Sequence, residues 1–83
     1  MTVTIRYFAG ARHAAGTQEE QRAIAGPIAL AELVRQLPDA ARAELVTVLL
    51  RCSFLVNEVA VIDASQLVTD GDVIDVLPPF AGG

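Results

Sequence analysis

Polar and apolar positions alternate at the start of the chain. In residues 2–8, TVTIRYF, the apolar residues Val3, Ile5 and Tyr7 are separated by Thr and Arg. This period of two predicts a strand with one buried face.

Two less apolar segments follow this strand. Residues 9–16 are expected to form a loop, with room for one helical turn, that closes at Gly16. The middle of residues 17–26 is polar and charged, as edge strands commonly are. It is therefore interpreted as an edge strand that returns beside the first strand.

The next apolar residues have the spacing of a helix. Leu30, Leu33, Val34 and Leu37 stand at i, i+3, i+4 and i+7, and Pro38 follows them. This spacing predicts a helix with one apolar stripe that ends at the proline. A second helical stretch is predicted over residues 40–50, because Asp39 is a suitable N-cap for it. One face of that stretch would carry four apolar residues: Ala41, Leu45, Val48 and Leu49.

Short strands and turns complete the pattern. Residues 53–57 and 73–77 are apolar and are expected to be buried strands, and residues 58–62 would form a short strand after a turn at Asn57. The acidic DGD at residues 70–72 predicts a turn. Helices between two groups of strands indicate an α+β fold with one sheet packed on helices. A mixed sheet with the first and last strands adjacent and parallel would suit a β-grasp, although the pattern alone predicts only an α+β roll.

The composition narrows the class of protein. The chain has 83 residues, which suit one domain, and 53% of them are hydrophobic, which argues against disorder. No apolar run is long enough to span a bilayer, and the start lacks the pattern of a signal peptide, so the expected location is the cytoplasm. The net charge of −4 disfavours nucleic acid and anionic membranes as partners and permits attraction to a basic protein surface.

Few residues that support catalysis are present. The chain has no Lys, one Cys and one His, which excludes a P-loop or Schiff-base lysine, a disulfide and a Cys/His zinc site. His13 is expected to be a solvated loop residue, and Cys52 a small core residue rather than a reactive thiol. The two acids around Gly71 fit a turn better than a calcium loop. No set of residues predicts a self-contained enzyme or a metal site.

The chain ends in VLPPFAGG, and this ending suggests a function. Pro78 and Pro79 cannot continue a sheet ladder and favour an extended exit from the last strand. Residues 78–83 would span up to about 20 Å. Because Gly82 and Gly83 have no side chains, this end could enter a narrow channel and present its carboxylate there. A frayed terminus or the remnant of a tag is the alternative.

Four short motifs follow one another along the whole chain: YFAGAR at residues 7–12, VN at 56–57, L..DGD at 67–72 and PP.AGG at 78–83. Each is weak alone, but together they resemble the small subunit of molybdopterin synthase in the MoaD/ThiS family of sulfur carriers. The resemblance implies a ubiquitin-like β-grasp, with a mixed sheet packed on one main helix plus a second helical stretch. It also implies a single domain over residues 1–83 with a flexible tail at residues 78–83.

The resemblance further implies a chemistry at the terminal glycine. Gly83 would be adenylated by an E1-like, MoeB-like adenylyltransferase that uses ATP and magnesium, and then converted to a thiocarboxylate with sulfur from a donor protein. The tail, with Ala81 and Gly82 near its tip, would enter a MoaE-like large subunit within a heterotetramer. There it would deliver sulfur to cyclic pyranopterin monophosphate, and two deliveries would build the dithiolene of molybdopterin. The chain itself would bind no cofactor and would not be catalytic alone.

The same resemblance implies a partner interface. Phe8 matches a family aromatic at the partner-facing surface, although an ordinary core aromatic is an equal interpretation. Arg12 matches a family arginine near the activating enzyme, although a solvated charge is the simpler interpretation. The interface would also include four residues around the exit of the tail: Leu77, Pro78, Pro79 and Phe80.

The chain departs from the family pattern at three positions. The family often has Glu where this chain has Val73, Phe where it has Leu77, and Val where it has Phe80; these differences could change the choice of partner. Residues 48–57, VLLRCSFLVN, are also unusually apolar, with no functional interpretation. Two other functions stay open: a carrier for thiamine thiazole, cysteine or tRNA thiolation, and a β-grasp interaction module or protein modifier that carries no sulfur.

Overall fold

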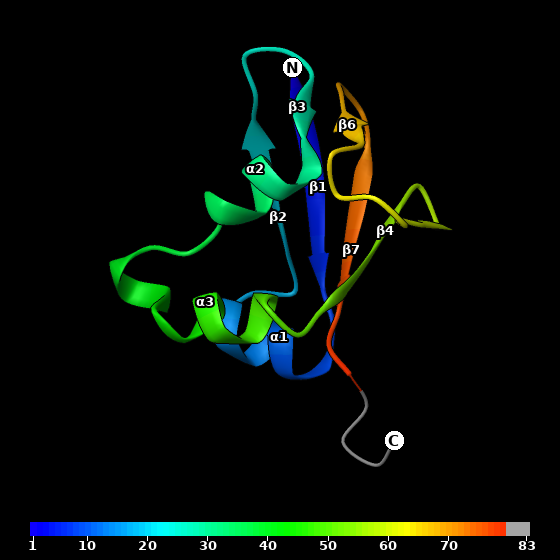
Figure 1. The fold of residues 1–83 in the computed structure, drawn as a ribbon. Coiled ribbons are helices and arrows are strands. Elements are labelled where there is room, and N and C mark those ends of the chain that lie inside the picture. Colours follow the sequence, from blue (N-terminus) through cyan, green and yellow to red (C-terminus); the bar gives the residue numbers. More distant parts are fainter. Residues whose placement is uncertain (80–83) are drawn as a thin grey trace.

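A computed structural model describes residues 1–79 as a mixed sheet with three short helices (Figure 1). Its strands are β1 (Thr2–Tyr7), β2 (Glu19–Ala23), β3 (Ile28–Ala29), β4 (Ser53–Val56), β5 (Val59–Ala60), β6 (Leu67–Val68) and β7 (Val73–Leu77). Its helices are α1 (Ala9–Ala15), α2 (Leu30–Arg35) and α3 (Glu44–Leu49), with a 3₁₀ turn at Ala40–Arg42. The main sheet has the order β2-β1-β7-β4-β5, and β3 pairs separately with β6.

The first and last strands are adjacent and parallel at the centre of the main sheet. Ile5 of β1 lies opposite Ile74 of β7, and Tyr7 lies opposite Val76. β2 and β4 flank this pair in antiparallel orientation. This is the β-grasp arrangement that the resemblance implied, and it brings the carboxyl ends of β1 and β7 to the same end of the sheet (Figure 1).

One face of the sheet is buried under the helices. Val3, Ile5 and Tyr7 are fully buried, which confirms the predicted alternation in β1. The segment from α2 to α3 covers this face with four buried leucines: Leu30, Leu33, Leu37 and Leu45. Burial of each such side chain contributes roughly 1.5–3 kcal/mol, so this layer supplies much of the stability of a small domain.

The prediction of a loop at residues 9–16 was wrong, because residues 9–15 form α1. Alanine is the strongest helix former, and Ala11 and Ala15 bury the inner face of this helix. Gly16 ends the helix in the left-handed conformation, with φ of 75°, and its N–H donates to the Arg12 carbonyl. Residues 1–79 therefore form three short helices rather than one main helix and a second stretch.

The other helical predictions were correct in place but not in extent. α2 ends at Arg35, shortly before Pro38, and residues 40–50 divide into the 3₁₀ turn and α3. Asp39 caps the turn as predicted, because its Oδ1 accepts from the Ala41 N–H at 2.9 Å. Ala41 itself is exposed, so its assignment to the apolar face was wrong.

The two predicted turns are confirmed. Asn57 and Glu58 have positive φ values of 50° and 68° between β4 and β5, as a two-residue hairpin requires. Gly71 has φ of 84°, and the acids on either side of it hold the turn. Asp70 Oδ1 accepts from the N–H at the start of β1 at 2.8 Å, and Asp72 Oδ1 accepts from Asn57 Nδ2 at 3.0 Å.

Candidate functional site at the end of strand β7

The chain leaves the sheet from its centre. β7 lies between β1 and β4, and its last pair joins Leu77 to Ser53. Pro78 and Pro79 follow directly, and neither has an N–H to extend the ladder. Leu77 and Pro78 are half-buried and Pro79 is exposed. These three residues, the tail root, therefore bring the chain to the surface at one end of the sheet.

Two further residues of the predicted interface lie at this end. Phe8 connects β1 to α1, is half-buried, and donates its N–H to the Val76 carbonyl at 3.3 Å. Arg12 is exposed on α1, and its Nε donates to the Tyr7 carbonyl at 3.4 Å. The structure thus brings Phe8 to the end of β7 and Arg12 to the adjacent end of β1. The remaining predicted residues lie outside the described part of the chain: Phe80, Ala81, Gly82 and Gly83.

The structure adds a groove that the sequence did not predict. Its volume is about 250 Å³, and its walls are formed by α1, α3, Arg51 after α3 and the two prolines of the tail root. Its lining residues are Gly10, Thr47, Val48, Arg51, Pro78 and Pro79. No sequence signal could find this tail-root groove, because only the packing of α1 against α3 brings Gly10 and Arg51 to the prolines.

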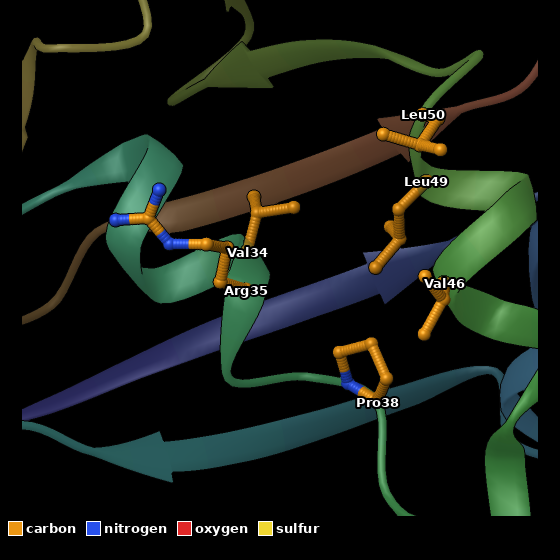
Figure 2. Close-up of a pocket in the computed structure, with 6 residues that line it drawn as sticks. All are labelled: Val34, Arg35, Pro38, Val46, Leu49 and Leu50. Atoms are coloured by element: carbon orange, nitrogen blue, oxygen red, sulfur yellow. The ribbon is translucent and has the colours of Figure 1, made fainter.

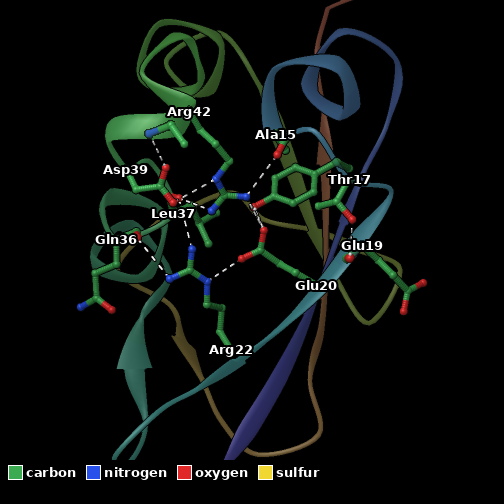
Figure 3. A network of polar contacts seen from close by, with 11 residues as sticks. Ala15, Thr17, Glu19, Glu20, Arg22, Gln36, Leu37, Asp39 and Arg42 are labelled. Carbon is green, nitrogen blue, oxygen red and sulfur yellow. Dashed lines mark hydrogen bonds and ion pairs between the residues drawn. The ribbon is translucent and has the colours of Figure 1, made fainter.

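A network of charged groups fixes the segment before α3 (Figure 3). Glu20 of β2 accepts from Arg42 Nη1 at 2.5 Å and from Arg22 Nε at 2.5 Å. Arg42 also donates to the carbonyls of Leu37 and Ala15. Burial opposes the ionisation of Glu20, but the hydrogen bonds from the two arginines outweigh it and lower its pKa. The network ties the approach to α3 to β2 and to the end of α1, and so helps to position one wall of the tail-root groove.

The face of the sheet away from the helices holds a buried acid. Asp75 is 4% exposed and alternates with Ile74 and Val76, which point into the core. It accepts from Arg6 twice, Nε to Oδ1 at 2.5 Å and Nη2 to Oδ2 at 2.8 Å. The fork of Arg6 satisfies a carboxylate that would be costly to bury alone. The sequence predicted a buried strand at residues 73–77, but it did not predict that Arg6 would pair with Asp75.

A second hollow lies between α2 and α3 (Figure 2). It has a volume of about 170 Å³, and Leu50 at its edge is 83% exposed. Its lining residues are Val34, Arg35, Pro38, Val46, Leu49 and Leu50. Part of the apolar segment at residues 48–57 is therefore surface rather than core, on a different face of α3 from the tail-root groove.

Comparison of the sequence with protein families gives a match to the family described as ThiS over residues 5–83. The chain belongs to the ThiS family. The match runs from β1 through the tail root and includes every residue of the predicted site. No curated protein matched the sequence.

Solved structures show the same fold as this ThiS-family chain. SAMP1 from Haloferax volcanii has a TM-score of 0.84 at 20% identity, with 100% of each chain covered. A putative molybdopterin converting factor subunit 1 from Pyrococcus furiosus has a TM-score of 0.82 at 23% identity, covering 96% of this chain and 99% of its own. Subunits 1 and 2 of the molybdopterin-converting factor from Helicobacter pylori were solved as a complex; this match has a TM-score of 0.65 at 24% identity and covers 100% of each chain. These likenesses establish the ubiquitin-like β-grasp fold.

In this ThiS-family chain the single cysteine is a packed residue. Cys52 is half-buried, its Sγ donates to the Val48 carbonyl at 3.2 Å, and burial raises the pKa of its thiol. A thiol with a raised pKa is a poor nucleophile, in agreement with its predicted role. His13 is exposed on α1 rather than in a loop.

Within residues 1–79, no group of three or more His, Cys, Asp or Glu side chains could hold a metal ion. None of the helices in the described part of the chain is long and apolar enough to cross a membrane. The distinctive feature of these residues is the exit of the chain at the tail root.

Proposed function

We propose that this chain is the sulfur-carrier subunit of a molybdopterin synthase and that Gly83 carries the sulfur. The observation that carries the proposal is the ThiS-family match, which extends through residue 83. The tail root supports it, because the chain reaches the surface at Pro79 directly after a strand at the centre of the sheet.

The proposed chemistry takes place on the Gly83 carboxylate. A free carboxylate is a poor acyl donor, so an E1-like adenylyltransferase first joins it to AMP. The carboxylate oxygen attacks the α-phosphorus of ATP, with Mg²⁺ on the phosphates, and pyrophosphate leaves. A sulfide equivalent from a donor protein then displaces AMP and leaves a thiocarboxylate. In the large subunit the thiocarboxylate sulfur bonds to a carbon of cyclic pyranopterin monophosphate, and an oxygen substituent of that carbon leaves. Water then hydrolyses the bond between this sulfur and the Gly83 carbonyl, which returns Gly83 to a carboxylate; two carriers complete one dithiolene.

The two prolines and the three small residues that end the tail have different roles in this proposal. Pro78 and Pro79 restrict the backbone to an extended course at the exit from β7. Ala81, Gly82 and Gly83 have the smallest side chains or none, so they suit a narrow channel in an enzyme that must reach the carboxylate.

We propose that the partners dock around the tail root. The large subunit would contact the half-buried Phe8 and the residues Leu77 to Phe80, and the exposed guanidinium of Arg12 would pair with an acidic group of the activating enzyme. The Helicobacter pylori complex of subunits 1 and 2 supports a large-subunit partner, and we propose a heterotetramer of two small and two large subunits.

Intact-mass spectrometry tests the first step. The protein is incubated with ATP, a sulfur donor and a matched activating enzyme. A mass gain of one oxygen-to-sulfur exchange, mapped to Gly83 and absent when Gly83 is deleted, supports a sulfur carrier. An unchanged mass, while a known carrier is converted in the same assay, refutes the proposal.

Reconstitution tests the pathway. The thiocarboxylated protein is mixed with a large subunit and cyclic pyranopterin monophosphate, and in parallel with a thiazole precursor. Formation of molybdopterin supports the proposal. Transfer of labelled sulfur to the thiazole precursor instead would assign the carrier to another pathway.

A protein modifier is the second candidate. The observation that favours it is the likeness to SAMP1, which is named a small archaeal modifier protein. As a modifier, the chain would join its C-terminal glycine to lysines of other proteins, but it could not build chains on itself because it has no Lys. Covalent adducts to many proteins in cells, lost on deletion of Gly83, would support this function over the first.

A further inference from the structure

The hollow between α2 and α3 has a projecting apolar side chain at its edge (Figure 2). Its lining is apolar except for Arg35, and Val34 of α2 faces Leu49 of α3 across it. Leu50, which follows α3, is 83% exposed, and Val46, one turn before it, is 51% exposed. Exposed apolar side chains grouped beside an apolar hollow are typical of an interaction site.

The hollow has room for one leucine side chain. An apolar cavity of about 150 Å³ accepts benzene, which has six carbon atoms, whereas a leucine side chain has four. A hollow of about 170 Å³ therefore accepts one such side chain. Leu50 of the same chain leaves this space open, because it lies at the edge of the hollow and is largely exposed.

Hydrogen bonds fix the segment that joins α2 to α3. Arg22 donates to the carbonyl of Gln36 at 3.4 Å and to that of Leu37 at 3.2 Å, and Arg42 donates to the same Leu37 carbonyl. Pro38, which lines the hollow, follows directly. The hollow is therefore formed before a partner arrives, which lowers the entropy cost of binding.

The charges at the rim are complementary to those of a second copy. Arg35 of α2 is exposed and pairs with Glu32 on the same helix, so the two signs lie side by side. Two copies related by a two-fold axis present the same surface to each other, and Arg35 of each copy can then face Glu32 of the other. Because the whole chain has a net charge of −4, most pairings of two copies bring acidic surfaces together, whereas a contact here brings opposite charges together.

We propose that two copies of this chain associate through the hollow between α2 and α3. Leu50 of each copy enters the hollow of the other, as an isologous contact requires, and Arg35 of each copy faces Glu32 of the other. The contact is built from two six-residue helices, so it is small and the dimer is weak and reversible. It lies on a different face of α3 from the tail-root groove, so both tail roots stay open to other partners.

Sedimentation equilibrium of the full chain tests the association. Between about 1 µM and about 1 mM protein, the mean mass should rise from that of one chain toward that of two. Leu50→Glu should weaken the association by about 100-fold or more, because each of the two copies loses a buried leucine. A wild-type protein that stays monomeric up to about 1 mM overturns the proposal.

Val59→Glu is the matched control for Leu50→Glu. It also replaces an exposed apolar residue by an acid, but it lies on β5 rather than at the hollow. Both side chains are exposed, so neither change should unfold the protein, which circular dichroism checks. Val59→Glu should associate like the wild-type protein, and equal losses in the two variants overturn the proposal.

Charge reversal tests the two-fold arrangement. Arg35→Glu places two acids at the rim of each copy, and Glu32→Arg places two arginines there. Each variant alone should associate more weakly than the wild-type protein, because like charges then face each other. An equal mixture of the two variants should associate at least as strongly as the wild type. A mixture that associates no better than either variant alone overturns the facing of the two helices.

NMR identifies what covers Leu50. In a mixture of labelled and unlabelled copies, the Leu50 methyl groups of one copy should show nuclear Overhauser effects to Val34 of the other. Leu50 methyl resonances that move only when a large subunit is added would assign the hollow to that partner and overturn the dimer. None of these measurements uses ATP or sulfur, so their failure leaves the sulfur-carrier proposal intact, and failure of sulfur loading leaves them valid.

Discussion

Replacement of Arg42 by methionine tests whether the network in Figure 3 supports the fold. Methionine keeps most of the apolar stem and removes the charge and all donors. The side chain of Arg42 is 14% exposed and that of Glu20 is 19% exposed, so water can replace the lost contacts only in part. Glu20 would keep Arg22 as a partner, whereas the Ala15 carbonyl would lose a side-chain donor.

The contacts of Arg42 determine how much stability its replacement should remove. Breaking a fully buried ion pair costs about 3–5 kcal/mol, and a hydrogen bond to a charged group contributes about 1.5–3 kcal/mol. Because Glu20 retains one arginine and some solvent, we expect Arg42→Met to lower the free energy of unfolding by about 2–3 kcal/mol. A domain of this size has a total of roughly 4–12 kcal/mol, so the loss would be large.

Urea unfolding followed by circular dichroism at pH 7 measures the effect. The midpoint should fall with little change in the slope of the free energy against urea, and the melting temperature should fall by about 10–20 °C. Arg35→Met is the control, because Arg35 forms an exposed pair with Glu32 and should cost no more than about 0.5 kcal/mol. Equal losses from the two substitutions would refute the reasoning.

Three further predictions concern single residues. The folded-state pKa of Glu20 is lowered below its ordinary value of 4.5, so its contribution to stability is present above that pH and is lost as the pH falls. The urea midpoint should therefore drop less on acidification in Glu20→Gln than in the wild-type protein. An equal drop in the two proteins would contradict the role of Glu20. Gly16 has φ of 75° with open space around it, so Gly16→Ala should lower the free energy of unfolding in urea by about 1–2 kcal/mol through backbone strain alone. Gly10→Ala, inside α1, should not destabilise the protein. Equal losses from the two substitutions would refute the backbone argument. Cys52 should react with a thiol reagent much faster in urea than in the native state, because burial raises its pKa; equal rates would contradict its burial.

Local patterns were sufficient for much of the fold. Val3, Ile5 and Tyr7 predicted β1 because a strand repeats every two residues, and the leucines of α2 predicted a helix because a helix repeats about every 3.6 residues. A helix cap was predicted at Asp39 and turns at Asn57 and Gly71, because each of these features depends on only a few adjacent residues. α1 was missed because it has only seven residues and its apolar positions are alanines, which do not form a clear hydrophobic stripe. β3 and β6 were missed because two residues show no period.

The sequence by itself determined the class of fold, the family resemblance and the residues at which the chemistry is proposed, because each of these depends on short stretches of adjacent residues. Only the tertiary structure decided what surrounds them. Arg6 and Asp75 are 69 residues apart along the chain, yet their strands pair in the sheet and the two side chains meet. Gly10, Arg51 and Pro79 form one groove only because α1 packs against α3 beside the end of β7. Contacts between distant segments depend on how the elements pack, and no local pattern in this chain predicts that packing.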